Sequence, residues 1–229
     1  MRQLPRRHKG TLGMTLIEVI CVVGIVASLA ALMFPTFASS RRAAQVGVCL
    51  SNLQQCDRAL KLYSIDYDDM VPRGKDCVDL QIPEVHPASI RPEIRAIPLL
   101  SDLTRPYLQK REVWRCPLDS GTLALDTAPH MAFPNHPSLF ESCGMSYSFI
   151  TSLGLGASWT SIERLGEQMI LADQAGHWHP GSQALDPRMM IGDHMTLWQT
   201  YRYNIAYFDG HVARNRTYTQ HRDAWGRSR

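Results

Sequence analysis

Aspartate and histidine side chains recur in the C-terminal third of the chain, beside short apolar runs that favour β-strands. The set comprises Asp173, His177, His179, Asp193, His194, Asp209 and His211. Imidazole nitrogens suit a transition metal such as zinc, whereas carboxylate oxygens suit calcium. Turns ordinarily select such residues as well, and none of the spacings reproduces a known ligand signature. The set is therefore a candidate metal site that the sequence alone does not assemble.

The six cysteines are Cys21, Cys49, Cys56, Cys77, Cys116 and Cys143. Cys49 and Cys56 lie on one predicted helix, roughly 10 Å apart along its axis, which is too far for a disulfide between them. We interpret both as core residues. Three cysteines, Cys77, Cys116 and Cys143, follow in predicted loops and cannot all pair internally. We expect one disulfide among them, between Cys116 and Cys143. The sequence contains no CxxC motif, which argues against a zinc ribbon or a redox dithiol.

The catalytic and cofactor signatures that the sequence approaches are all incomplete. GLGASW at 154–159 has Trp159 where a dinucleotide-binding loop needs its third glycine, and GMSYS at 144–148 ends in serine where a nucleophile elbow ends in glycine. DYDDMVPRGKDC at 66–77 departs from an EF-hand loop, because Val71 occupies the glycine position and Cys77 that of the bidentate glutamate. We therefore predict that the protein is not an enzyme.

Positive charge is concentrated at the start of the chain. The basic residues there are Arg2, Arg6, Arg7 and Lys9, and no acidic residue precedes Gly13. The formal net charge is +3, but removing these four from the 24 basic residues leaves 20 against 21 acidic ones. This distribution argues against nucleic-acid binding, which needs basic residues spread over a folded face. A short basic cluster before an apolar run instead orients the chain, with the cluster in the cytoplasm.

Residues 14–37 form an apolar segment that is long enough to cross a bilayer. It offers about 24 residues against the roughly 20 that a spanning helix needs, and no charge occurs from Val19 to Phe34. Glu18 is the exception, and an unpaired carboxylate inside a membrane costs on the order of 3 kcal/mol. Three interpretations compete: a secretory signal removed near Ala30, a plain single-pass anchor, and a segment whose carboxylate finds a partner in an assembly.

The sequence GMTLIEV at 13–19, followed by the apolar run, resembles the N-terminal signal of type IV pilins and type II secretion pseudopilins. The resemblance implies that a prepilin peptidase cleaves between Gly13 and Met14 and that the new terminus is methylated. It implies that Glu18 guides assembly by pairing with the Met14 amine of a neighbouring copy. Pro35 lies where helices of this family often carry a proline. Met14 departs from the family, in which phenylalanine is commonest at this position.

The resemblance also implies where the protein acts and with what. Residues 1–13 are then a cleaved cytoplasmic leader, 14–37 the transmembrane and assembly helix, and the rest lies in the periplasm or another extracytoplasmic space. The partners are copies of the chain, other pseudopilins, the prepilin peptidase, an inner-membrane assembly platform and membrane lipid. The protein is expected as a single-pass inner-membrane protein that enters a pilus-like filament. A type II secretion pseudopilin is favoured over a pilus subunit.

A helical pattern resumes beyond the apolar segment. Apolar residues recur every three or four positions from Val46 to Tyr67, and polar residues occupy the other side. This predicts that residues 38–70 are the amphipathic second half of a long helix that begins near Thr15. The segment DYDDMVP at 66–72 should end it, because three aspartates oppose the helix dipole and Pro72 stops the helix.

The remaining residues, 71–229, form the predicted head. Residues 72–142 are rich in proline, and we expect a loop-rich insertion there with one short helix in 98–109. Residues 143–220 contain four runs typical of strands: MSYSFI, EQMILAD, TLWQTYRYNIAYF and HVARNRTY. Asp209-Gly210 predicts a two-residue hairpin turn with positive φ at both positions. The predicted fold class is α+β and pilin-like, with the long helix packed on a C-terminal antiparallel sheet.

The C-terminal run YNIAYFDGHV, with WRCP, SYSFI and ILADQ, also resembles a subgroup of prepilin-like proteins whose heads close with such a hairpin. Some pseudopilin heads hold calcium in a loop near the sheet. The resemblance therefore makes Asp173, Asp193 and Asp209 candidate calcium ligands, and no other cofactor is expected.

The alternative hypothesis is a membrane-tethered enzyme or a metal-dependent binding module outside the cytoplasm. It rests on the C-terminal aspartate and histidine set, with His177, His179 and His211 as ligands. A transition metal bound by these histidines would favour this hypothesis over the structural subunit.

Overall fold

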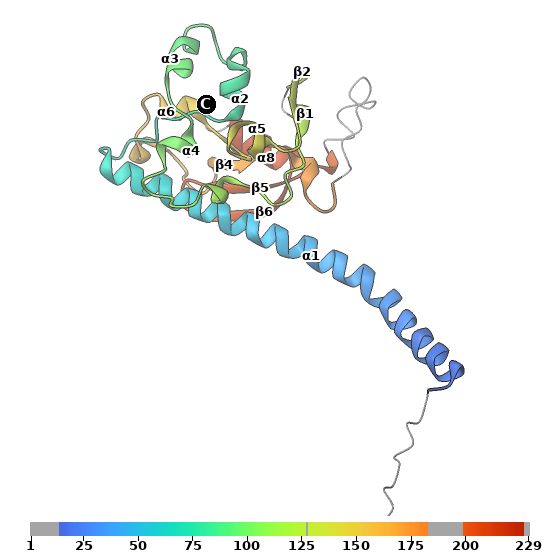
Figure 1. The fold of residues 1–229 in the computed structure, drawn as a ribbon. Helices are drawn as coiled ribbons and strands as arrows, with labels where there is room; N and C mark the ends of the chain where they lie inside the picture. The colour runs from blue at the N-terminus through green and yellow to red at the C-terminus, as the bar shows by residue number, and fades with distance from the viewer. Residues whose placement is uncertain (1–13, 127, 183–198, 227–229) are drawn as a thin grey trace, which may run out of the picture. The chain divides into compact units, whose positions relative to one another are not determined.

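The computed structural model describes residues 14–126, 128–182 and 199–226. The chain divides into two compact units, Met1–Arg41 and Arg42–Arg229. Helix α1, Leu16–Asp66, contributes residues to both units (Figure 1). The second unit contains every other helix and strand of the described residues, and it is called the head below.

Helix α1 begins one residue after the predicted start near Thr15, and it ends at Asp66, four residues before the predicted limit at residue 70. It continues through Pro35, and it ends in the predicted segment, where Asp68 and Asp69 adopt positive φ angles of 51° and 61°. Within the head its apolar stripe is buried, at Val46, Cys49, Leu53, Cys56 and Leu60. This three- and four-residue spacing places the stripe on one side of the helix, as the sequence pattern predicts.

The four predicted strands form one antiparallel sheet in the order β3-β4-β5-β6. Its strands are β3 (Tyr147–Phe149), β4 (Met169–Asp173), β5 (Arg202–Tyr207) and β6 (Val212–Thr217). One core cluster joins Cys49 and Leu53 of α1 to the sheet, and Figure 1 shows α1 passing along β5 and β6. A second cluster packs Ala224 of helix α8, Tyr218–Gly226, against other sheet residues. The sheet thus gains its core from helices at both ends of the chain, which confirms the α+β layout.

The hairpin between β5 and β6 lies where Asp209-Gly210 predicts it. The Gly210 N–H donates to the Tyr207 carbonyl at 2.8 Å, and the Tyr207 N–H donates to the His211 carbonyl at 3.0 Å. Gly210 has a φ of 95°, whereas Asp209 is not among the residues with positive φ. The prediction of positive φ at both positions is therefore wrong. The connection is a three-residue loop in which the glycine alone takes the left-handed conformation.

The proline-rich insertion contains more regular structure than its sequence predicts. Its helical elements are α2 (Cys77–Gln81), η1 (Pro83–Val85), α3 (Arg91–Ala96), α4 (Leu100–Leu103), η2 (Arg111–Trp114) and α5 (Leu139–Cys143). It also holds a hairpin of β1 (Thr122–Leu125) and β2 (Ala128–Asn135) that the sequence did not predict. Pro129 and Pro134 lie within β2, and proline obscures a strand pattern. Three short helical elements occur in the segments that connect the strands of the main sheet along the sequence. They are α6 (Thr151–Gly154) and η3 (Trp159–Ser161), between β3 and β4, and η4 (Gly176–Trp178), between β4 and β5.

The disulfide of the head joins Cys77 to Cys143, with a Cα–Cα distance of 5.8 Å. The predicted pairing of Cys116 with Cys143 is therefore wrong, and Cys116 is a free, buried thiol. The reason is local: Asp76 caps α2 and places Cys77 in its first turn, beside the end of α5 where Cys143 lies. The bond ties the start of the insertion to its end.

Candidate functional site

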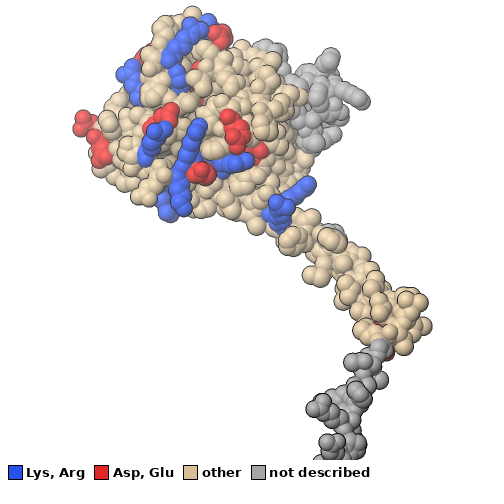
Figure 2. All heavy atoms as spheres, in the orientation of Figure 1, with Lys and Arg blue, Asp and Glu red and all other residues tan. Residues whose placement is uncertain are grey.

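The first candidate is the apolar segment 14–37, which consists of the start of α1 and the two residues before it. Its large apolar side chains are exposed along the whole segment, from Met14 at 69% and Leu16 at 78% to Phe37 at 71%. Figure 2 shows an almost uniformly uncharged surface there, in contrast to the charged groups of the head. Among the described residues, α1 is the one helix long and apolar enough to cross a membrane. Such a surface needs lipid or another protein to cover it.

Glu18 caps the helix on which it lies. The Thr15 backbone N–H and hydroxyl both donate to the Glu18 carboxylate, at 2.7 Å and 2.8 Å, and the Glu18 N–H donates to the Thr15 hydroxyl at 3.4 Å. This reciprocal pattern is a capping box, in which a threonine precedes a helix and a glutamate lies three residues later. The carboxylate therefore has partners within its own chain, which the sequence argument did not foresee.

The other residues of the prepilin-type signal are only partly described. Gly13 lies outside the described residues, so the structure does not bear on the cleavage position. Met14 directly precedes the capping residue Thr15 and is exposed. For this segment the structure therefore describes two features: the apolar surface and the capped start of α1.

The second candidate is a buried cluster of metal-ligating side chains in the head. Cys49 comes from α1, Cys116 from the segment after η2, Asp173 from the end of β4, and His179 from the residue after η4. One ligand atom from each lies within 4.8 Å of all the others. Cys49, Cys116 and Asp173 are 0% exposed and His179 is 2% exposed. Two thiols, one imidazole and one carboxylate therefore converge in the core; they are called the Cys/Asp/His cluster below.

Hydrogen bonds link the members of the Cys/Asp/His cluster. The Cys49 thiol donates to Asp173 Oδ1 at 3.1 Å, and His179 Nε2 lies 2.7 Å from Asp173 Oδ2. The Asn204 backbone N–H also donates to Oδ2, at 2.6 Å. Both oxygens of this buried carboxylate are thus engaged, as a charge in the core requires.

The electrostatics of the Cys/Asp/His cluster follow from burial and from Asp173. Burial raises the pKa of Cys49 well above its usual value, and it also raises the pKa of Cys116. Burial alone would lower the pKa of His179, but attraction to the Asp173 carboxylate and their hydrogen bond raise it to about 10. Without a metal ion the cluster therefore consists of two neutral thiols and an imidazolium paired with a carboxylate.

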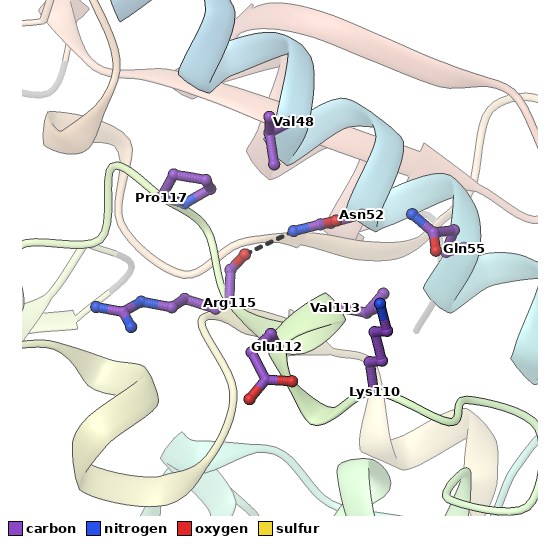
Figure 3. Close-up of a pocket in the computed structure, with 8 residues that line it drawn as sticks. All are labelled: Val48, Asn52, Gln55, Lys110, Glu112, Val113, Arg115 and Pro117. Atoms are coloured by element: carbon purple, nitrogen blue, oxygen red, sulfur yellow. Dashed lines mark hydrogen bonds between the residues drawn. The ribbon is translucent and has the colours of Figure 1, made fainter.

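Two hydrogen bonds beside a groove along α1 hold Cys116 close to Cys49. Figure 3 shows Asn52 of α1 donating from Nδ2 to the Arg115 carbonyl, at 2.8 Å. One turn further along the helix, the Cys56 thiol donates to the Val113 carbonyl at 3.7 Å. The groove is lined by Val48, Asn52, Gln55, Lys110, Glu112, Val113, Arg115 and Pro117. These two contacts hold the segment after η2 against α1, and Cys116 follows directly.

The predicted metal residues separate in the structure. Asp209 is exposed at the β5–β6 turn, where it pairs with His211 Nδ1 at 2.6 Å, whereas Asp173 is buried in the Cys/Asp/His cluster. The described residues therefore do not assemble the predicted calcium set, and Asp193 lies outside them. The prediction assumed that aspartates at strand ends lie close together. A position at a strand end does not by itself bring two side chains together.

Of the predicted histidine ligands that the structure describes, His179 alone joins the Cys/Asp/His cluster. His177 Nε2 lies 3.1 Å from the Gly121 carbonyl, and burial lowers its pKa to about 4. His194 lies outside the described residues. The sequence argument missed Cys49 and Cys116 as partners of His179. No ligand spacing links residues so far apart in the chain, and each had another interpretation.

A cavity of the head, with a volume ≈ 950 Å³, is lined in part by buried carboxylates that make contacts within the fold. Asp76 accepts the N–H groups of α2 and of Phe149. Asp79 pairs with His86, and Asp126 accepts the Tyr203 hydroxyl at 2.6 Å. Burial raises the pKa of Asp126 to about 6. These carboxylates are therefore engaged in contacts within the fold.

Neither a family model, a curated protein nor a solved structure matches this chain. The function must therefore be argued from the two candidates themselves.

Proposed function

We propose that the protein is a structural subunit of a pilus-like filament, anchored in the membrane through α1 and processed between Gly13 and Met14. The observation that carries the proposal is the continuous exposure of large apolar side chains from Met14 to Phe37. In the filament this segment packs against other copies of the chain, and before assembly it lies in the lipid bilayer. The protein acts by assembly and not by turnover.

The disulfide supports an extracytoplasmic head. Disulfides such as Cys77–Cys143 persist in oxidising compartments and are rare in the cytoplasm. The basic residues before Gly13 favour the opposite, cytoplasmic side for the start of the chain. Together these features support a single-pass protein with its head outside the cytoplasm.

The capping box refines the proposed role of Glu18. A carboxylate that accepts hydrogen bonds from Thr15 costs less in a membrane than an unpartnered one, so the unassembled subunit is tolerable. Cleavage after Gly13 would create a charged amine at Met14, next to Thr15 in the sequence. The cap therefore orients the Glu18 carboxylate before assembly. In the proposed pairing, the positively charged amine of a neighbouring copy then binds this carboxylate.

Processing is the first test. Co-expression of the full chain with a prepilin peptidase should remove residues 1–13 and leave methylated Met14, as intact-mass measurement reports. Gly13→Ala should reduce cleavage sharply, whereas Gly10→Ala, in the same leader, should not. An uncut chain, or a cut near Ala30, would overturn the proposal, because either result leaves no free amine at Met14.

Assembly is the second test, and the capping box supplies matched variants. Glu18→Gln keeps a side chain that can cap the helix but removes its charge, whereas Thr15→Ala weakens the cap and keeps the charge. We expect Glu18→Gln to be cleaved and inserted normally but to enter filaments poorly, and Thr15→Ala to assemble better than Glu18→Gln. Filament content is measured by shearing and quantitative immunoblotting. Normal incorporation of Glu18→Gln would refute the charge pairing.

The Cys/Asp/His cluster does not favour an enzymatic function. Its four side chains are at most 2% exposed, so a substrate has no route to them in this conformation. These four buried side chains can therefore contact one another and their neighbours in the head, but not a substrate.

A further inference from the structure

We propose that Cys49, Cys116, Asp173 and His179 bind one zinc ion, which is structural and joins α1 to the sheet and its loops. The inference rests on the convergence of four metal-ligating groups from four separate elements at one buried point. It is independent of the filament function proposed above.

The donor set selects the metal. Two thiolates with one imidazole and one carboxylate suit zinc, which takes sulfur, nitrogen and oxygen ligands in tetrahedral geometry. Calcium and magnesium require oxygen ligands and would leave the two sulfurs unused. The cluster is therefore a transition-metal site, and zinc fits four protein ligands without an open position.

The distances are close to those of an occupied site. Ligand atoms around a tetrahedral zinc ion, with bonds of about 2.0–2.3 Å, lie roughly 3.3–3.8 Å from one another. The four ligand atoms here all lie within 4.8 Å of one another, and the Cys49 sulfur is 3.1 Å from Asp173 Oδ1. Small side-chain movements are therefore enough to bring all four to bonding distance.

The hydrogen bonds indicate which atoms change roles. The Cys49 thiol proton, donated to Asp173 Oδ1, is displaced by the metal, which leaves Oδ1 free to bind it. Asp173 Oδ2 keeps the Asn204 N–H at 2.6 Å, and His179 gives up its proton and binds through Nε2. One Zn²⁺ enters, and the two thiol protons and the imidazolium proton leave. No atom is oxidised or reduced.

Further donors surround the sulfur of Cys49. Asn204 Nδ2 lies 3.5 Å from it, and the Tyr147 hydroxyl lies 3.7 Å away. Zinc with two thiolates and one carboxylate carries a net charge of about −1, which N–H and O–H donors stabilise. Buried donors of this kind support a closed structural site.

A disulfide between Cys49 and Cys116 is the competing outcome, since the head already contains one disulfide. Both cysteines are free thiols in the structure. An oxidised pair could not supply two thiolates, so the two outcomes exclude each other and can be separated by one set of measurements.

The test uses the full chain purified in detergent. Metal content is measured by inductively coupled plasma mass spectrometry, and we expect one zinc per chain. Chelator-treated protein is then titrated with Co²⁺ alone, and we expect visible bands of tetrahedral Co²⁺ together with thiolate-to-metal charge transfer. Cys116→Ser should lose the stoichiometric zinc. Cys56→Ser is the matched control, because Cys56 is equally buried on α1 but lies outside the cluster, and it should keep the zinc.

Three results would overturn the proposal. One is a wild-type chain that neither contains zinc nor takes up Co²⁺. Another is peptide mapping that finds Cys49 and Cys116 joined as a disulfide. The third is a Co²⁺ complex without thiolate charge transfer, which would place the metal elsewhere. Each of these is read on the wild-type protein, so the conclusion does not depend on whether Cys116→Ser folds.

Discussion

The two parts of α1 differ in what covers their apolar side chains. In the first part, Leu29 and Leu32 are 58% and 73% exposed, whereas Leu53 and Leu60 in the head are 0% exposed. The sequence differs in the same way: the first part is apolar on all sides, and the second alternates its apolar stripe with residues such as Lys61. An amphipathic pattern matches a partner within the same chain, and an all-apolar pattern matches lipid or another chain.

Polar groups follow the same division. Asp57 in the head is 2% exposed, and its carboxylate pairs with Lys61 Nζ at 3.1 Å. Burial raises the pKa of Asp57, and Lys61 partly offsets that shift. Glu18 in the first part also pairs locally, with Thr15, and this contact is exposed. Both carboxylates therefore have a partner within four residues in the sequence, and the two parts differ in that the head buries its carboxylate.

The largest effect should come from removing the disulfide of the head. Replacing Cys77 and Cys143 together by alanine should lower the free energy of unfolding by about 4 kcal/mol, because the bond constrains a long loop of the unfolded chain. The sequence separation of the two cysteines is 66 residues. Cys21→Ala, in the exposed apolar part, should leave this free energy unchanged. Denaturant unfolding of the full chain in detergent, followed by tryptophan fluorescence, measures both, and equal effects would contradict the division between the two parts.

A matched pair of leucines gives the next largest effect. Leu53→Ala should destabilise the head by about 3 kcal/mol, because it leaves a cavity between α1 and the sheet. Leu32→Ala makes the same chemical change on the same helix, where the side chain is 73% exposed, and it should not alter the unfolding of the head. The same denaturant titration applies. A loss of stability in Leu32→Ala would mean that the apolar part also supports the head.

Acid should affect the head through His221. Burial lowers the pKa of His221 to about 4, although Asp173 opposes the shift. An unfolded histidine titrates near 6.5, so the unfolded state takes up the proton first and stability falls as the pH drops from about 6.5 towards 4. The loss at pH 5 should be on the order of 2 kcal/mol for this group.

Melting temperatures at pH 7 and pH 5 test this expectation. His221→Phe should flatten the pH dependence, because the aromatic ring can still stack on Tyr203, whose ring centroid lies 4.2 Å away. Part of the slope should remain from His177, whose pKa is also lowered to about 4. His211→Asn, at an exposed position, is the control and should leave the slope as it is. If His221→Phe showed the same pH dependence as the wild type, a buried neutral His221 would be ruled out. This comparison isolates His221, because groups such as Asp126, whose pKa burial raises, change the stability in the opposite direction and act equally in both proteins.

The elements predicted correctly are those with long or repeated patterns. Helix α1 shows its three- and four-residue spacing over many turns, and β5 and β6 flank a turn with a glycine at the required position. Hairpin β1–β2 has two prolines in one strand and an irregular register, so its sequence shows no alternation. Sequence patterns therefore predict elements with a regular apolar spacing or a characteristic turn residue. They do not predict elements without such a pattern, which depend on contacts with the rest of the fold.

The candidate sites show the same limit. Glu18 and its neighbours were identified because an isolated carboxylate in an apolar run is conspicuous. The Cys/Asp/His cluster was not identified, because Cys49 fits the buried stripe of a helix and Cys116 fits a loop disulfide. The contact that unites them depends on the segment after η2 being held by Asn52, and no sequence spacing encodes that contact.

The smallest effect concerns the start of α1. Thr15→Ala removes the side chain that accepts the Glu18 N–H and one of the donors to its carboxylate, and it should weaken the first turn by about 1 kcal/mol. Hydrogen exchange of the amides of residues 16–19, measured in detergent micelles, should become faster by several fold, while amides near Leu53 should not change. Thr15→Ser keeps the hydroxyl and should exchange like the wild type. If Thr15→Ala exchanged as slowly as Thr15→Ser, the surrounding apolar medium and not the cap would hold the helix start, and Glu18 would be left without its partner before assembly.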